Sequence, residues 1–299
     1  MSYLDVLPQI QNTTALGQYE KAIAYQQQHH DISKEMGNRH GVANSLGSLG
    51  ICYKNLGEYE KAIVYQQQHH DISEEIGNRH GVAISLGSLG ICYKNLGEYE
   101  KAMTYYQQSL EISEEIGYRQ GVAKSLGNLG NCYKNLGKYE KAIAYHHQSL
   151  EIDEEMGNRQ GVASSLGSLG LCYDSLGQYE KAITYHQQSL EIKEEMGHQK
   201  GVAISLHNIG DIFIKLENYS EAETKIQASL VISQEINYKN LIPDNLKALA
   251  EIAHQTNQPQ LALSHCQNAL SLSQELGIPL VKDCEELLAK IQENLGDNQ

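Results

Sequence analysis

The sequence contains no tryptophan, one phenylalanine and four prolines among its 299 residues. It has no apolar run near the roughly 18 residues that a membrane span requires, and its opening MSYLDVLPQIQNTT lacks the basic and apolar regions of a secretory signal. Basic residues are also scarce, with 23 Lys and Arg against 37 Asp and Glu. Because nucleic acids attract positive charge, the net charge of −14 argues against a nucleic-acid binder. We therefore expect a cytoplasmic protein that binds neither nucleic acid nor membrane.

The six cysteines form neither a CxxC pattern nor a disulfide framework. Four of them recur at one interval of 40 residues, at Cys52, Cys92, Cys132 and Cys172. Free cysteine behaves as a small apolar side chain, so we interpret these four as buried residues of a repeat.

A repeat of the same length runs through nearly the whole chain. The segment Gly-Glu-Tyr-Glu-Lys-Ala at residues 57–62 returns unchanged at residues 97–102. The alanine of this segment recurs at Ala22, Ala62, Ala102, Ala142, Ala182, Ala222 and Ala262. The chain is therefore predicted to be one repeat array rather than two globular domains.

Each repeat contains two helical stretches that glycines separate. Between residues 78 and 95, Val82, Leu86, Leu89 and Cys92 follow one another at steps of three and four, which is typical of one face of a helix. Residues 98–116 show a similar spacing, and a glycine follows each stretch where a left-handed cap is wanted. Such a short helical hairpin cannot bury its apolar faces alone, so neighbouring hairpins are predicted to stack.

The residues of the hairpin resemble the tetratricopeptide repeat. The match rests on Leu46, Leu49, Gly50 and Tyr53 in the first helix and on Ala62 and Tyr65 in the second. Leu46 stands where the family usually has tryptophan, and the closing proline is replaced by Glu74, Glu114, Glu154 and Glu194. The unit is 40 residues long rather than the family's usual length of about 34. Without the proline, the second helix is predicted to continue to about the glycines at 77, 117, 157 and 197.

This long unit is similar to the arrays of kinesin light chains, of Pins-type mitotic adaptors and of bacterial and cyanobacterial proteins. The resemblance implies an all-α fold, a right-handed superhelical solenoid of tandem helix-turn-helix repeats that binds extended partner segments. We expect a degraded N-terminal segment at residues 1–16, an array of about six to seven repeats at residues 17–277, and a C-terminal capping helix and tail at residues 278–299.

In the family, the first helix of each unit lines the inner wall, and the resemblance assigns candidate peptide-binding residues to it. They are Asn44, Lys54, Asn55, Ile84, Ile91, Lys94, Asn95, Lys124, Asn128, Asn131, Lys134 and Asn135, with Arg39, Arg79, Arg119 and Arg159 near the rim.

Charge counting supports this assignment independently of the family. The first-helix stretch 77–96 has a net charge of +2 and the stretch 117–136 a net charge of +3, whereas the second-helix stretch 98–116 has a net charge of −4. Later first helices contain Asp174 and Asp211, so we predict that the anion-favouring part of the groove lies in the N-terminal half. Arginine and asparagine suit carboxylates and peptide backbone, respectively. Single surface charges commonly have no binding role, and a merely solvated face is the alternative interpretation.

Other motifs give weak signals for chemistry. Each of the pairs at His29, His69 and His146 is two adjacent histidines, which point about 100 degrees apart on a helix and cannot chelate a metal alone. Gly47-Ser48-Leu49-Gly50 lacks the partners of a phosphate-binding loop. Every candidate nucleophile repeats with the array, whereas a catalytic site needs unique converging residues. We expect no enzyme, no metal and no cofactor.

The leading prediction is a scaffold or adaptor that binds an extended, acidic peptide or partner protein in the groove. One alternative is a self-associating structural repeat protein, suggested by the missing first helix of the first repeat. Another is a peptide-sensing regulatory subunit of a signalling system.

Overall fold

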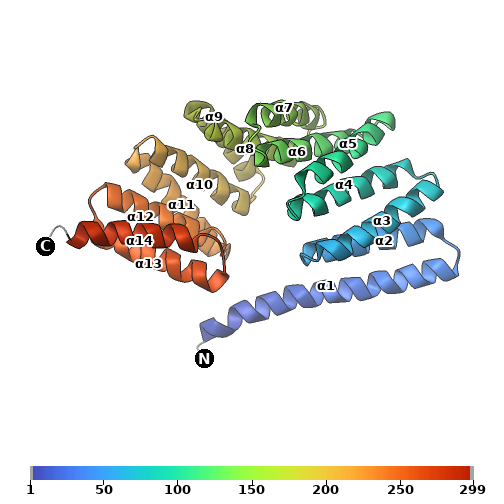
Figure 1. Ribbon diagram of the computed structural model, residues 1–299, viewed down its shortest axis with the longest axis horizontal. Coiled ribbons are helices and arrows are strands. Elements are labelled where there is room, and N and C mark those ends of the chain that lie inside the picture. The colour runs from blue at the N-terminus through green and yellow to red at the C-terminus, as the bar shows by residue number, and fades with distance from the viewer. Residues whose placement is uncertain (1–2, 297–299) are drawn as a thin grey trace. The chain divides into compact units, whose positions relative to one another are not determined.

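The computed structural model describes the backbone of residues 3–296 and the side chains of residues 17–294. The described backbone folds into fourteen helices without a strand, which confirms the predicted all-α class (Figure 1). In chain order they are α1 (Tyr3–Glu35), α2 (Arg39–Asn55), α3 (Tyr59–Glu75), α4 (Arg79–Asn95), α5 (Tyr99–Glu115), α6 (Arg119–Asn135), α7 (Tyr139–Glu155), α8 (Arg159–Ser175), α9 (Tyr179–Glu195), α10 (Gln199–Lys215), α11 (Tyr219–Glu235), α12 (Ile242–Gln255), α13 (Pro259–Leu276) and α14 (Val281–Gly296).

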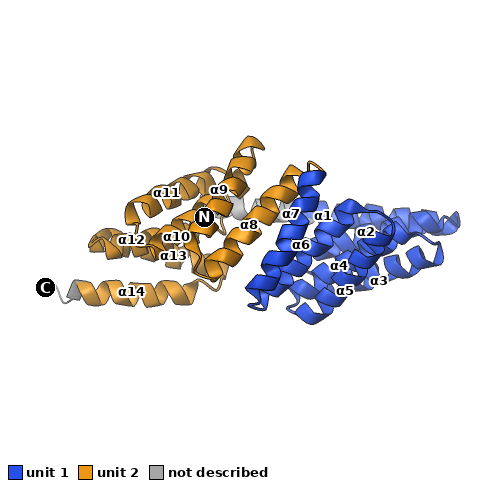
Figure 2. Cartoon of the chain, turned by 90° about the horizontal axis from the view of Figure 1, so that it is seen from above, with its two compact units in different colours: residues 1–155 blue, residues 156–299 orange. Residues whose placement is uncertain are grey.

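The chain forms two compact units, unit 1 with helices α1 to α7 and unit 2 with helices α8 to α14 (Figure 2). Within each unit, an even-numbered helix and the odd-numbered helix after it, such as α2 and α3, pack as a hairpin. We call the first helix of a hairpin helix A and the second helix B. Helix α1 runs unbroken across residue 16, and α14 packs on α13 in unit 2. The domain limits expected at residues 16 and 277 stay predictions.

Local chemistry sets the helix ends at the predicted positions. Asn78 caps α4, because its side-chain oxygen accepts a hydrogen bond of 3.0 Å from the Gly81 amide. Gly77 follows α3 with a φ of 70°, a left-handed conformation that glycine adopts without strain. Helix B continues to Glu75 in α3 and to Glu115 in α5. This confirms the extended second helix expected from the missing proline.

Small residues let the two helices of a hairpin approach closely. The repeated alanines of helices B, from Ala62 to Ala262, are fully buried. Opposite them lies a glycine of helix A, and a Cβ added at Gly50 would come within 2.4 Å of the Gln66 side chain. The same close contact joins Gly90 to Tyr106, at 2.6 Å. Each of the five hairpins from α2–α3 to α10–α11 is thus held by one large helix-B side chain that fills the space left by a glycine, whereas α12 has Ala250 at this position.

The side chain that fills this space differs between hairpins. In unit 1 it is Gln66, Tyr106 or His146, and in unit 2 it is His186 or Ile226. The two histidines are almost completely buried, and burial lowers the pKa of both to about 4. They are therefore neutral in the folded protein at neutral pH.

Substitution of the two kinds of helix-A glycine is expected to have opposite effects on stability. Gly90→Ala places a Cβ 2.6 Å from the buried Tyr106 ring and should lower the free energy of unfolding by about 1–3 kcal/mol. Gly87→Ala meets only Ser109 Oγ at 3.5 Å, so it should raise stability by up to about 1 kcal/mol through higher helix propensity. Urea unfolding followed by circular dichroism measures both variants. Equal losses of stability in the two variants would contradict the explanation that Gly90 is required by its close contact with Tyr106.

The buried histidines predict that stability falls in mild acid. The unfolded chain binds a proton on each histidine below a pKa of 6.5, whereas folded His146 and His186 remain neutral until about pH 4. The contribution is therefore fully present above pH 6.5 and is lost as the pH falls through this window, at about 2 kcal/mol per histidine near pH 5. Urea midpoints across this range should shift less in His146→Gln than in the wild type. The exposed His147→Gln variant is the matched control, and an equal slope in all three proteins would contradict the prediction.

Candidate functional site

The outward faces of α2, α4 and α6 form a continuous polar surface of unit 1, which we call the A wall. Side chains at steps of three and four along one helix share a face. The A wall consists of Asn44, Ser48, Ile51 and Asn55 on α2, Ile84, Ser88, Ile91 and Asn95 on α4, and Lys124, Asn128, Asn131 and Asn135 on α6, all of them exposed or half-buried. It therefore contains most of the residues that the sequence assigned to a peptide groove.

Two depressions interrupt the A wall where consecutive helices A meet. The one between α2 and α4 has a volume of about 280 Å3 and lies between Asn44, Ile51 and Ser88. The one between α4 and α6 has a volume of about 180 Å3 and lies between Ile84, Ile91 and Asn128. Each combines an aliphatic side chain with amide or hydroxyl groups, which suits a side chain and the adjoining backbone of an extended peptide.

Three half-buried lysines, Lys54, Lys94 and Lys134, lie near the C-terminal ends of these helices. Burial raises the pKa of the Cys92 and Cys132 thiols to about 11, and Lys54 and Lys94, respectively, oppose that shift. Each of these two lysines therefore acts electrostatically on the next helix A. The adjoining asparagines Asn55, Asn95 and Asn135 are exposed.

The four arginines predicted at the rim are engaged in ion pairs. Each lies at the start of a helix A and pairs with a glutamate near the end of the helix B of the same hairpin. The pairs are Arg39 with Glu75, Arg79 with Glu115, Arg119 with Glu155, and Arg159 with Glu195. We call these pairs arginine clips. A bound anion would have to compete with a carboxylate at each arginine, so their role in binding stays a prediction.

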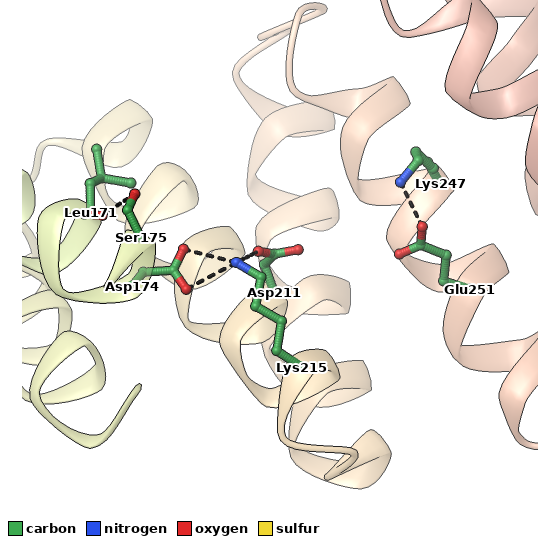
Figure 3. Close-up of polar contacts among 7 residues, drawn as sticks. All are labelled: Leu171, Asp174, Ser175, Asp211, Lys215, Lys247 and Glu251. Atoms are coloured by element: carbon green, nitrogen blue, oxygen red, sulfur yellow. Dashed lines mark hydrogen bonds and ion pairs between the residues drawn. The ribbon is translucent and has the colours of Figure 1, made fainter. Parts of the chain in front are cut away.

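The same face of unit 2 is arranged differently, as Figure 3 shows for α8, α10 and α12. Asp174 stands at the repeat position of Lys134, and Lys215 Nζ lies 2.8 Å from oxygens of both Asp174 and Asp211. Burial acts to lower the pKa of Lys215, but the two aspartates outweigh it and raise that pKa. On α12, Lys247 pairs with Glu251 at 2.6 Å. Here the positive charges are neutralised by neighbouring carboxylates.

Sequence reasoning missed one half-buried cation in unit 2. Lys193 on α9 donates a hydrogen bond of 2.9 Å to Ser205 Oγ, and burial lowers its pKa. The repeat position it occupies is serine in the neighbouring α11 and α13, at Ser233 and Ser273. Aligning the repeats by this position would have identified Lys193 as an exception. Ser48 and Ser88 of the depressions were also missed, because nothing in their pattern separates them from surface serines.

The histidine pairs do not assemble a metal site in the part of the chain that the structure describes, where no three His, Cys, Asp or Glu residues converge. His69 is buried instead, and a Cβ added at Gly47 would come within 2.8 Å of its ring. Gly47 therefore provides room for the His69 side chain. None of the described helices is both long enough and apolar enough to span a membrane.

The arginine clips are expected to contribute little to stability, because both partners are about half exposed and solvent screens their attraction. A double-mutant cycle with Arg79→Ala and Glu115→Ala should give a coupling energy below about 1 kcal/mol in urea unfolding. A coupling above about 2 kcal/mol would show that the clip is a main element of the hairpin instead of a surface contact.

Comparison with known protein families agrees with the repeat described above. A family model described as tetratricopeptide repeat matches residues 12–75, 53–115 and 121–195. No sequence among the curated proteins matches this chain significantly.

Several solved structures share the fold. A signal transduction ATPase with numerous domains and a tetratricopeptide repeat sensor from Pyrococcus horikoshii aligns with a TM-score of 0.75 and 18% identity, over 97% of this chain and 44% of that one. The nearly identical repeats of a kinesin light chain-like protein from Podosopora anserina give a TM-score of 0.53 and 17% identity, over 64% of this chain and 95% of that one. A Rap protein complexed with competence and sporulation factor gives a TM-score of 0.60 and 15% identity, over 88% of this chain and 77% of that one.

The matched segments cover more than half of the chain and extend over the hairpins of unit 1 and the first hairpin of unit 2. The glycine, alanine and tyrosine positions that carry the repeat are those at which the helices of each hairpin meet. The chain belongs to the tetratricopeptide repeat family.

Proposed function

We propose that unit 1 binds an extended acidic segment of a partner protein along the A wall. Tetratricopeptide repeats indicate a protein–protein interaction scaffold, and proteins built from them are in general non-enzymatic. The proposal adds the place of binding and the chemistry of the partner to that general role.

The observation that carries the proposal is the separation of charge between the two helices of each hairpin. Helices α2, α4 and α6 contain lysine and arginine but not one aspartate or glutamate. Helix α5, by contrast, carries Glu100, Glu111, Glu114 and Glu115. An acidic segment would therefore be attracted to the A wall and repelled from the helix-B side of the unit.

The side chains of the A wall suit an extended chain with regular side-chain spacing. The exposed amides of Asn55, Asn95 and Asn135 recur once per hairpin and can both donate to and accept from peptide groups. The lysines beside them would pair with carboxylates. Ile51 and Ile84, which are 44% and 38% exposed, provide apolar contact between the polar groups.

We expect this protein to bind its partner in a reducing compartment. The six cysteines are thiols, and five of them are completely buried or nearly so, at Cys92, Cys132, Cys172, Cys266 and Cys284. This supports the cytoplasmic location expected from the sequence. The fold shared with the Rap protein complexed with competence and sporulation factor supports its use in holding a partner.

Removing two lysines that adjoin the A wall should weaken binding of an acidic peptide. The probe is a fluorescein-labelled peptide of alternating glutamate and leucine, titrated by fluorescence polarisation at several salt concentrations. Lys94→Ala with Lys134→Ala should lower affinity roughly tenfold and reduce the salt dependence, because two charge pairs are lost.

The matched control is Lys101→Ala with Lys141→Ala, which removes the same charge from helices B. Lys101 lies over the Tyr93 ring and pairs with Glu98, so it belongs to the hairpin rather than to the A wall. The control should bind the probe like the wild type. An equal loss of affinity in both double variants would indicate that only the net charge of the protein matters, and would contradict the assignment of the A wall.

A further inference from the structure

Helix α1 is a helix B that has no helix A. Its residues 17–22 read Gly-Gln-Tyr-Glu-Lys-Ala and align with residues 57–62, which lead into α3. In α3 the preceding residues turn back and form α2, whereas the backbone of α1 continues as one helix from Tyr3. The hairpin that α1 should close is therefore half present.

The face of α1 that corresponds to the covered face of α3 is open. Tyr25 is 70% exposed and His29 is exposed, whereas His69 at the equivalent position of α3 is only 7% exposed. Ala22 is half-buried, and Ala62 has no exposed surface. Ile32 and Met36, at 47% and 75% exposure, extend the apolar surface towards the end of the helix.

Three contacts that recur in complete hairpins are missing at α1 among the described residues. The ring of Tyr65 stacks on Tyr53 at 5.2 Å, but that of Tyr25 meets no other ring. Lys61 lies over the Tyr53 ring at 5.3 Å, but Lys21 lies over none.

The third contact is the arginine clip. Glu75 pairs with Arg39, whereas Glu35 at the end of α1 has no arginine partner within the described part of the chain. Residues 17–36 carry a net charge of −1, and first-helix stretches such as residues 77–96 carry +2. The three missing contacts and the net negative charge of residues 17–36 together indicate one kind of ligand.

That ligand is a helix with the spacing of helix A. It carries an arginine at its start, a glycine eleven residues later and a tyrosine three residues after the glycine, as Arg39, Gly50 and Tyr53 do in α2. The arginine would meet Glu35, the glycine would admit the side chain of Gln26, and the tyrosine would stack on Tyr25.

We propose that the open face of α1 binds, from another polypeptide, an amphipathic helix of this helix-A pattern. Helices α2, α4 and α6 of a second copy are already packed in their own hairpins, so the donor is a chain whose helix A lacks a helix B. The surface is separate from the A wall, and the proposal does not depend on the acidic partner. It makes α1 a second docking site, selective for a repeat helix.

The test uses the full chain with Tyr25→Trp and a synthetic peptide of residues 79–96. Because the sequence has no other tryptophan, the introduced side chain reports on α1 alone. Binding should give a saturable blue shift of its emission. In the unsubstituted protein, the peptide should slow hydrogen exchange in residues 19–35 and leave the other helices unchanged.

Two controls make the result specific. A peptide with Gly90→Val should bind at least about tenfold more weakly, because an added Cβ at the equivalent Gly50 lies 2.4 Å from Gln66. The protein variant Tyr105→Trp should show no shift, because Tyr105 is already stacked on Tyr93 at 5.3 Å. Circular dichroism verifies that both protein variants keep the helical content of the wild type.

Absence of an emission shift together with unchanged hydrogen exchange would overturn the proposal, as would equal binding of the Gly90→Val peptide. Sedimentation at several protein concentrations tests for a different ligand of α1, a second copy of this chain. Self-association of the wild type that Tyr25→Asp abolishes would show that α1 binds a second copy of this chain, and would also overturn the proposal.

Discussion

The contact between a helix-A glycine and one large helix-B side chain is the constraint on which five of the six described hairpins depend. At Gly50, Gly90, Gly130 and Gly170 there is no room for a Cβ, because Gln66, Tyr106, His146 and His186 fill that space. The fully buried alanine one turn earlier on helix B brings the backbones close enough for this contact. Every other recurring contact, including the stacked tyrosine rings and the arginine clips, requires that the two helices lie at this short distance.

Much of the fold could be predicted from the sequence, because a repeat presents each local signal several times. The positive-φ glycines and the extended helix B both lie where the periodic pattern placed them. The arginine clips could not be predicted in this way, since Arg79 and Glu115 are 36 residues apart and only the antiparallel packing of a hairpin brings them together. The role of Gly47 could not be predicted for a related reason. Its neighbour His69 comes from the other helix, and a sequence motif says nothing of that side chain.

The candidate site was predictable as a face but not as a set of interactions. Helical spacing was enough to place Asn95 and Asn135 on a common surface with Lys124. It could not show which charges are already neutralised. In unit 2, Lys215 lies between Asp174 and Asp211, so a count of lysines overstates the positive charge open to a ligand there. In unit 1, helices A contain no carboxylates, and the corresponding lysines have no acid on their own helix.

The arginine clips and tyrosine stacks have a consequence for how such an array changes over generations. Arg79 pairs with Glu115, and Tyr93 stacks on Tyr105, entirely within the hairpin of α4 and α5. The contacts that close a hairpin are therefore inherited together in one continuous stretch of coding sequence. Recombination between two such stretches, which are nearly identical, adds or removes a complete hairpin and leaves α3 facing a helix A with the sequence pattern it had before. The length of the array can therefore change in one genetic step, without an intermediate protein that is unable to fold.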